Sequence, residues 1–140
     1  MTKKETIIWF AGLFEGEGSI SRFRPRPNSG WRMSIRMTDE DIMKKVHENF
    51  GGSLYREERW KKRNPNWNNC WLWQLCKQKE VLKIVKDIYP YMGYRRRAKM
   101  DEFLAHPIRN KSENAKRNWA DPVFRKKWLK SRHPHIYVNK

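Results

Sequence analysis

Two glutamates, Glu15 and Glu17, alternate with glycines in the segment FAGLFEGEGSI. The spacing of apolar residues before them predicts a helix over residues 6–14 that ends at Gly16 and Gly18, since glycine adopts the left-handed cap conformation without a Cβ penalty. A carboxylate at a helix C-terminus faces the negative end of the helix dipole, which is unfavourable. A bound cation would reverse the sign of that interaction. Simple exposure to solvent is the alternative, and the segment alone leaves both open.

The chain as a whole is strongly basic. It holds 32 Lys and Arg against 15 Asp and Glu, which gives a formal net charge of +17 and a pI near 10.2. This excess predicts a polyanionic partner, and it disfavours a basic surface that is merely solvated. Nucleic acid is favoured over a membrane surface, because no basic stretch carries a strong apolar face.

The composition also bears on where the protein works. A mean hydropathy of -1.04, without an apolar run of membrane length, excludes a transmembrane span, and the N-terminus predicts no signal peptide. Cys70 and Cys76 lie six residues apart on one predicted strand, where a disulfide would be geometrically poor. Neither these cysteines nor the histidines have a zinc-ligand spacing. We expect two buried thiols in an intracellular, reducing compartment.

The segment Trp31–Thr38 (WRMSIRMT) alternates cleanly between apolar and polar residues. It predicts a half-buried antiparallel strand with Trp31, Met33, Ile35 and Met37 on its inner face. The outer face then carries Arg32, Ser34 and Arg36. Two arginines flanking a serine suit contacts to base edges and phosphates.

The rest of the chain supplies the elements that must position these residues. In order, the sequence predicts a helix over 6–14, strands over 19–24 and 31–38, a helix over 39–50, strands over 53–60 and 70–76, a helix over 80–88 and a further helix after Gly93. This αββαββα order predicts an α+β fold with one four-stranded antiparallel sheet and its helices on one face. The other face stays free. Such a concave, basic, twisted surface suits the major groove of DNA.

From His106 onward the composition changes. Ten Lys and Arg stand here against Glu113 and Asp121, so this quarter of the chain carries about half of the net charge. Helical patches with aromatic anchors, and Pro122 as a helix start, indicate an ordered basic arm. We therefore divide the chain into a domain over residues 1–105 and a basic C-terminal extension over 106–140 that binds DNA.

The element order together with FAGLFEGEG on the first helix resembles the LAGLIDADG homing endonucleases. Residues Phe10–Gly18 match that nine-residue motif position by position, with Phe for its opening Leu and Glu for both of its Asp. The basic sheet face and the later segment YPYMGYRRRAK fit the same family. The resemblance covers roughly Glu5–Leu104.

This resemblance implies a role for each residue of the motif. In the family, the motif helix packs against a second copy across a two-fold axis, and Ala11 and Gly12 would let two such helices approach closely. Glu15 would support the end of the helix pair. Glu17 takes the position of the metal-binding carboxylate, with the Gly16 carbonyl as a second oxygen ligand for Mg²⁺ or Mn²⁺. Because the chain has one copy of the motif, the resemblance implies a homodimer.

Three further positions are implied by the resemblance. Arg95 follows Pro90-Tyr91-Met92 at the place of the family's basic pocket residue, which is usually Lys, and Lys99 lies one turn onward. Because an arginine does not titrate near neutrality, Arg95 would stabilise phosphate or order water. Asp39 matches a polar pocket residue that could orient water, and it could equally serve as a helix N-cap.

The implied function is that of a site-specific double-strand DNA endonuclease, which hydrolyses both strands of a long, pseudo-palindromic site and leaves staggered ends. The residues expected to contact DNA are Ser21, Arg22, Arg24, Arg32, Ser34, Arg36, Arg56, Arg59, Lys61, Lys62, Gln74, Lys116, Arg117, Lys126 and Lys127. Three alternatives stay open. They are an RNA-binding maturase for intron splicing, a cleavage-inactive DNA-binding regulator on the same fold, and a basic ribosomal-type RNA binder, which would leave the motif unexplained.

Overall fold

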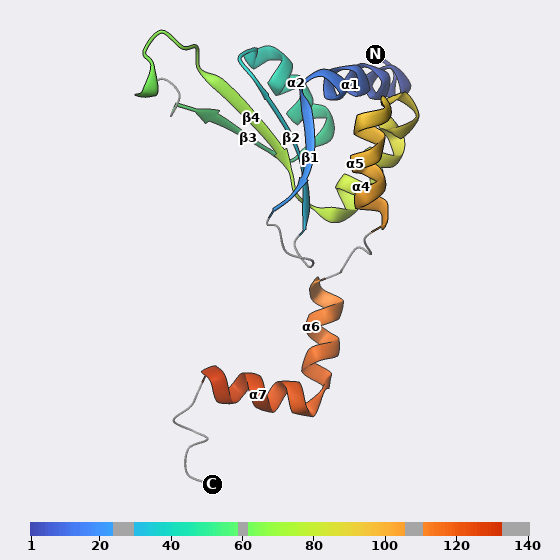
Figure 1. Ribbon diagram of the computed structural model, residues 1–140, viewed down its shortest axis with the longest axis vertical. Coiled ribbons are helices and arrows are strands. Elements are labelled where there is room, and N and C mark those ends of the chain that lie inside the picture. Colours follow the sequence, from blue (N-terminus) through green and yellow to red (C-terminus); the bar gives the residue numbers. More distant parts are fainter. Residues whose placement is uncertain (24–29, 59–61, 106–110, 133–140) are drawn as a thin grey trace. The chain divides into compact units, whose positions relative to one another are not determined.

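The computed structural model describes residues 1–23, 30–58, 62–105 and 111–132 (Figure 1). The chain divides into two compact units, Met1–His106 and Pro107–Lys140. The first unit contains, in chain order, α1 (Lys3–Glu17), β1 (Gly18–Arg22), β2 (Trp31–Met37), α2 (Glu40–Phe50), β3 (Ser53–Glu57), β4 (Cys70–Leu75), α4 (Gln78–Ile88), the 3₁₀ helix η1 (Tyr89–Tyr91) and α5 (Tyr94–Ala105). This order confirms the predicted αββαββα arrangement and the α+β class.

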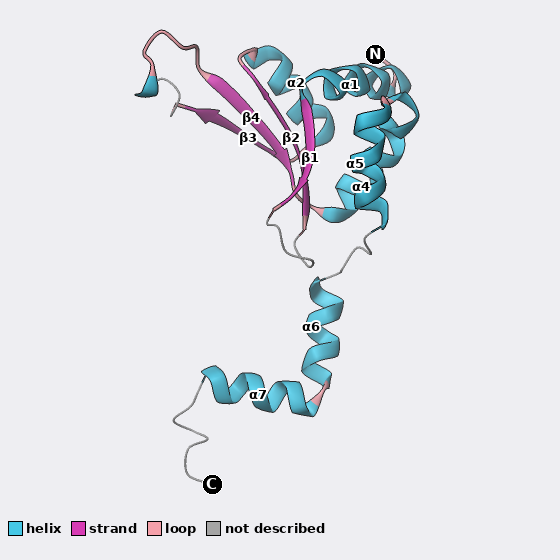
Figure 2. Cartoon of the chain, in the orientation of Figure 1, coloured by secondary structure: helices cyan, strands magenta, loops and turns pink. Residues whose placement is uncertain are grey.

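The four strands form one antiparallel sheet in the order β1-β2-β4-β3 (Figure 2). Helices pack on one of its faces, as predicted (Figure 1). The alternation in β2 is confirmed, because Trp31, Met33 and Ile35 are buried on that face. Trp73 and Leu75 of β4 are buried beside them, so the intervening residues of both strands face away from the helices.

Helix α1 is longer than its apolar spacing predicted. A capping box starts it at Thr2, whose hydroxyl accepts the Glu5 N–H (3.2 Å) while the Glu5 carboxylate accepts the Thr2 N–H (2.6 Å). Those hydrogen bonds lower the pKa of the Glu5 carboxyl. At its other end α1 continues through Gly16 to Glu17, and Gly18 has an extended backbone (φ -79°). The expected left-handed stop is therefore wrong: Gly18 is needed because a Cβ there would overlap the Phe14 ring.

The core joins α1 to the middle of the sheet through aromatic side chains. Phe10 packs edge-on against Trp73 (5.7 Å between ring centroids) and lies 4.1 Å from the ring of Phe50. The Trp73 indole N–H donates to the Gly51 carbonyl (2.7 Å). The next residue, Gly52, has φ 83° and comes so close to β4 that an added Cβ would lie 2.5 Å from the Gln74 carbonyl oxygen. These contacts hold the turn that follows α2 against β4.

The start of β2 is fixed by a side chain from α4. The Gln78 amide accepts the Trp31 N–H (3.1 Å) and donates to the Trp31 carbonyl (2.7 Å), as a neighbouring strand would. It also donates to the Cys76 carbonyl (2.8 Å). This contact links the first residue of β2 to the end of β4.

The two cysteines are unpaired, but they are not the buried thiols expected from the sequence. Cys70 is half-buried and Cys76 is exposed. Partial burial still raises the pKa of both thiols. Within the described part of the chain, every helix is too short or too polar to cross a membrane.

The second unit contains α6 (Lys111–Ala120) and α7 (Pro122–Arg132), and α7 begins at Pro122 as predicted. Asp121 joins them, and its carboxylate accepts the Val123 N–H (2.9 Å). Trp119 and Trp128 meet edge to face with centroids 5.4 Å apart. This contact and the Asp121 cap define the helix pair, since α7 has no buried residue.

Candidate nucleic-acid interface and catalytic centre

The C-terminal end of α1 is tied to the start of α5 through Glu15. The Glu15 carboxylate accepts the N–H of Gly93 (3.0 Å), directly before α5. The Glu15 carbonyl accepts from Nε and Nη2 of Arg96 (3.3 and 3.2 Å). A carboxylate thus lies at one helix N-terminus and a guanidinium at another helix's C-terminus, and both placements are favourable for the helix dipoles. The Glu15 carboxylate is therefore stabilised by the N-terminus of α5, and the end of the α1 backbone is stabilised by Arg96.

Glu17 has a different environment. Its side chain is exposed, and it makes no hydrogen bond or ion pair with any other described residue. The nearby Gly16 carbonyl lies in the last helical turn, where carbonyls lack intrahelical donors. A carboxylate and a carbonyl are oxygen donors that suit a hard divalent cation, and Mg²⁺ needs only one or two carboxylates when water and phosphate complete its shell. No group of three acidic, His or Cys side chains gathers among the described residues.

None of the other expected catalytic residues contacts Glu17 among the described residues. Arg95 is exposed on the first turn of α5, and Lys99 forms an ion pair with Glu102 (3.3 Å). Asp39 occupies the N-cap position of α2, although its side chain makes no capping hydrogen bond. The basic residue that binds the end of α1 is Arg96, and the sequence analysis missed it because three consecutive arginines left the phase of α5 undetermined.

The exposed side of α1 carries two glycines. Gly12 and Gly16 follow the exposed Ile8 at four-residue intervals, and no atom lies within 4 Å of a Cβ added at either glycine. Ala11, expected at a dimer contact, is only 1% exposed and packs in the protein's own core. Its side chain therefore cannot contact a second copy. The open side of the helix is the one marked by the two glycines.

The outward face of the sheet collects polar side chains from neighbouring strands. Cross-strand register places Ser34 between Ser19 of β1 and Gln74 of β4, and Arg32 opposite Ser21. The Arg32 guanidinium also lies over the Phe23 ring (5.7 Å). The register thus adds Ser21 and Gln74 to the outward face of Arg32, Ser34 and Arg36 that alternation predicted.

Two expected DNA contacts fall on the other side of the sheet. Arg22 is opposite the buried Trp31, and its guanidinium lies over that ring (5.2 Å). Arg56 is opposite Trp71, in the row of Met37. Each is offset by one register position from Arg32 or Arg36. Because side chains of a strand alternate between the two faces, neither shares the face of those arginines. The expected contacts Arg24, Arg59 and Lys61 lie outside the described residues.

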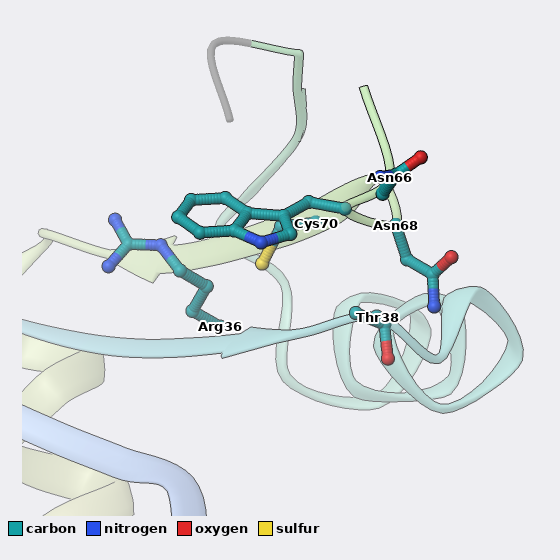
Figure 3. A pocket seen from close by; sticks show the side chains of 6 residues that line it. Arg36, Thr38, Asn66, Asn68 and Cys70 are labelled. Carbon is teal, nitrogen blue, oxygen red and sulfur yellow. The ribbon is translucent and has the colours of Figure 1, made fainter. Parts of the chain in front are cut away.

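A shallow hollow of about 530 Å³ lies at one end of the outward face (Figure 3). It is lined by Arg36 and Thr38 from β2 and its exit, Cys70 from β4, and Asn66, Trp67 and Asn68 from the preceding loop. Two amides and a half-exposed indole of this loop therefore share the hollow with an arginine of the outward face.

Further cations are exposed outside the sheet. Lys62 lies in the loop before β4, and Lys116, Arg117, Lys126 and Lys127 lie on α6 and α7. All five side chains are exposed.

The backbone arrangement matches solved structures of homing endonucleases. The group I intron-encoded enzyme I-CeuI, solved with DNA, aligns with a TM-score of 0.57 at 12% identity over 75% of this chain and 55% of that one. I-CvuI, solved with the I-CreI target, gives 0.53 at 14% identity over 70% and 62%. The archaeal I-Vdi141I, solved with DNA, gives 0.52 at 17% identity over 74% and 65%. The chain has the homing endonuclease fold.

Sequence comparison adds nothing to this result, because no sequence-family profile and no curated protein sequence matches the chain. The chain also spans only 55% to 65% of the length of the three homing endonucleases above. The homing endonuclease fold places FAGLFEGEG on α1 and the arginine-rich face on the open side of the sheet, in agreement with the resemblance drawn from the sequence.

Proposed function

We propose that the protein is a site-specific, divalent-metal-dependent DNA endonuclease of the LAGLIDADG type that acts as a homodimer on a long, pseudo-palindromic duplex. One observation carries the proposal. At the end of α1, a fold shared with proteins solved on DNA holds an exposed carboxylate, Glu17, that has no partner among the described residues. Unlike Glu15, it contributes no side-chain contact to the described fold, so its carboxylate oxygens can bind a cation.

In this proposal Glu17 and the Gly16 carbonyl hold Mg²⁺ or Mn²⁺ together with water and phosphate oxygens. The bound ion would neutralise phosphate charge and lower the pKa of a bound water. The protein's own contribution is positional. Arg96 holds the end of α1, while the exposed Arg95 is available to a phosphate oxygen and, always charged, cannot shuttle a proton. Asp39 and Lys99 are proposed to order water around the scissile phosphate.

The homodimer is proposed to form through the open side of α1. The motif occurs once in the chain, so two subunits are needed to supply one Glu17 for each DNA strand. Gly12 and Gly16 leave space on that side of the helix, and close backbone approach is the physical use of such small residues. Two-fold symmetry of the dimer predicts a pseudo-palindromic site.

A cleavage assay on purified full-length protein tests this function. Randomised duplexes are incubated with Mg²⁺, with Mn²⁺ or with EDTA, and the ends of cleaved molecules are sequenced. We expect metal-dependent cleavage at a defined site. Glu17→Gln should reduce cleavage at least about a hundredfold while sparing DNA affinity, because a metal ligand supplies several kcal/mol to the transition state.

The exposed Glu48 of α2 offers a matched control, since Glu48→Gln makes the same charge change away from the site. Cleavage by Glu17→Gln within a few fold of wild type would refute the metal assignment. Specific binding without cleavage would instead favour the regulator, and binding to a structured intron RNA in preference to duplex would favour the maturase. The fold and the intact carboxylate favour neither alternative.

The dimer has its own test. Gly12→Leu places a branched side chain where the proposal has two helices in contact, and overpacking of this kind costs about 1–3 kcal/mol. We expect wild type to sediment as a dimer and the variant to shift toward monomer with unchanged thermal unfolding of the subunit. A wild type that sediments as a monomer with and without DNA would contradict the arrangement.

A further inference from the structure

The outward face of the sheet carries one carboxylate in direct contact with one of its arginines. Arg36 Nε donates to Glu57 Oε2 (2.9 Å) and Arg36 Nη2 donates to Glu57 Oε1 (3.3 Å). The two residues belong to β2 and β3, which are not neighbours in the sheet. The Arg36 side chain therefore extends across β4 to reach its partner.

The pair lies over Cys70 of β4. Cross-strand register places Cys70 opposite Glu57, and Cys70 lines the same hollow as Arg36 (Figure 3). Burial is the main cause that raises the pKa of the Cys70 thiol. The positive charge of Arg36 lowers this pKa, and the negative charge of Glu57 raises it. The arginine side chain therefore runs along the outward face near Cys70.

Exposure differs between the two partners. The Glu57 side chain is 13% exposed, whereas that of Arg36 is 45% exposed. The carboxylate is thus mostly covered, and the guanidinium covers part of it. A guanidinium has five N–H donors in a rigid fork, and Glu57 accepts from Nε and from one N–H of Nη2. The two N–H groups of Nη1 and the second N–H of Nη2 take no part in these two hydrogen bonds.

We propose that Glu57 is a specificity-determining positioning residue, which holds Arg36 in the orientation that donates two hydrogen bonds to a guanine in the major groove. The inference rests on the proposed function, because it requires DNA on the outward face. A flexible arginine would reach phosphates as readily as bases. An arginine held by a bidentate carboxylate has lost that freedom, and it presents the fork geometry that matches guanine O6 and N7.

The hollow beside the Arg36–Glu57 pair also contains side chains that could contact DNA bases. Asn66 and Asn68 line it together with Arg36, at the other end of the hollow from the guanidinium (Figure 3). Amides pair with adenine in the major groove. A guanine bound by Arg36 would therefore leave these loop amides to contact a different position of the site.

The experiment is site selection on randomised duplexes with full-length wild type, Glu57→Gln, Arg36→Ala and the double variant. Glu58→Gln is the matched control, because Glu58 is the next residue, is exposed and undergoes the same charge change. We expect Glu57→Gln to keep or raise total affinity, since it removes a negative charge. Its preference for guanine should fall about tenfold or more at the two symmetric positions that Arg36→Ala also relaxes.

If Glu57 acts through Arg36, a second result is expected from the double variant. In the Arg36→Ala background, Glu57→Gln should change base preference no further, which is non-additivity typical of a contacting pair. Lys62→Ala, which removes a basic side chain from the loop before β4, should weaken all sequences equally and leave the preference unchanged.

Two results would overturn the inference, and they differ. Unchanged guanine preference in Glu57→Gln, with wild type binding a defined site, would refute the positioning role and leave the proposed function intact. Absence of duplex binding by wild type would refute the proposed function and this inference together.

Discussion

The two faces of the sheet are built from alternate residues of the same strands, yet they obey different constraints. On the helix side, Met33, Ile35 and Trp73 are at most 1% exposed. On the outward side, Ser34 and Gln74 lie directly opposite one another and are only half-buried. Successive residues of a strand therefore lie on opposite faces. On the helix side, the shape of the side chain determines stability. On the outward side, hydrogen-bonding groups can contact a partner.

This difference shows why the sheet can carry a recognition surface without losing stability. The helix side supplies the apolar burial that holds the strands in register, so the outward side chains need not stabilise the fold. The Arg36–Glu57 ion pair fits this division, because an ion pair of such exposure contributes little to the free energy of folding. Substitutions on the two faces should therefore produce separable defects.

The largest expected effect is on the helix side. Trp73→Ala removes a fully buried indole and its hydrogen bond to the Gly51 carbonyl, so we expect the free energy of unfolding to fall by about 3–5 kcal/mol. Equilibrium denaturation in urea measures this loss. In the second unit, where Trp128 remains 38% exposed, Trp128→Ala is the matched control and should leave that transition unchanged.

The adjacent residue should give the opposite result. Gln74→Ala is expected to change the free energy of unfolding by no more than about 0.5 kcal/mol. It should cost about 1–3 kcal/mol of discrimination at one or two symmetric base pairs, where an amide would contact adenine. Site selection and denaturation of the same preparation measure both quantities. A lower free energy of unfolding without a change in the selected DNA consensus would show that the two faces do not have separate roles.

The smallest expected effect lies outside the sheet. Lys126→Ala on α7 should weaken binding to all duplexes alike and reduce the slope of log affinity against log salt by about one, because a single phosphate contact is lost. Lys86→Ala on α4, equally exposed but on the helix side of the sheet, should leave the slope unchanged. A changed base preference in Lys126→Ala would mean that the second unit also reads sequence.

Features with a short repeat could be predicted from the sequence. The period of two in β2 assigned Arg32, Ser34 and Arg36 to one face, and the glycines and acidic residues around α2 gave its ends within two residues. Helix phase was harder. Apolar residues surround much of α1, so Ala11 was assigned to the outside although it is buried. The same difficulty hid Arg96 among its arginine neighbours.

Contacts across non-adjacent strands could not be predicted at all. The pairing of Arg36 with Glu57 depends on the strand order β1-β2-β4-β3 and on the register of two separate ladders. Neither is encoded locally. The displacement of Arg22 and Arg56 to the helix side has the same origin, because composition marks them as basic while register alone decides the face.

The two hydrogen bonds between the Gln78 amide and the Trp31 backbone affect how such a protein can change during evolution. The backbone of Phe23 also donates to the Gly30 carbonyl (2.9 Å), so both ends of the connection between β1 and β2 are anchored. Insertions or substitutions between these anchors should leave β2 in place. The connection could then change one residue at a time without a compensating change in the outward side chains Arg32, Ser34 and Arg36.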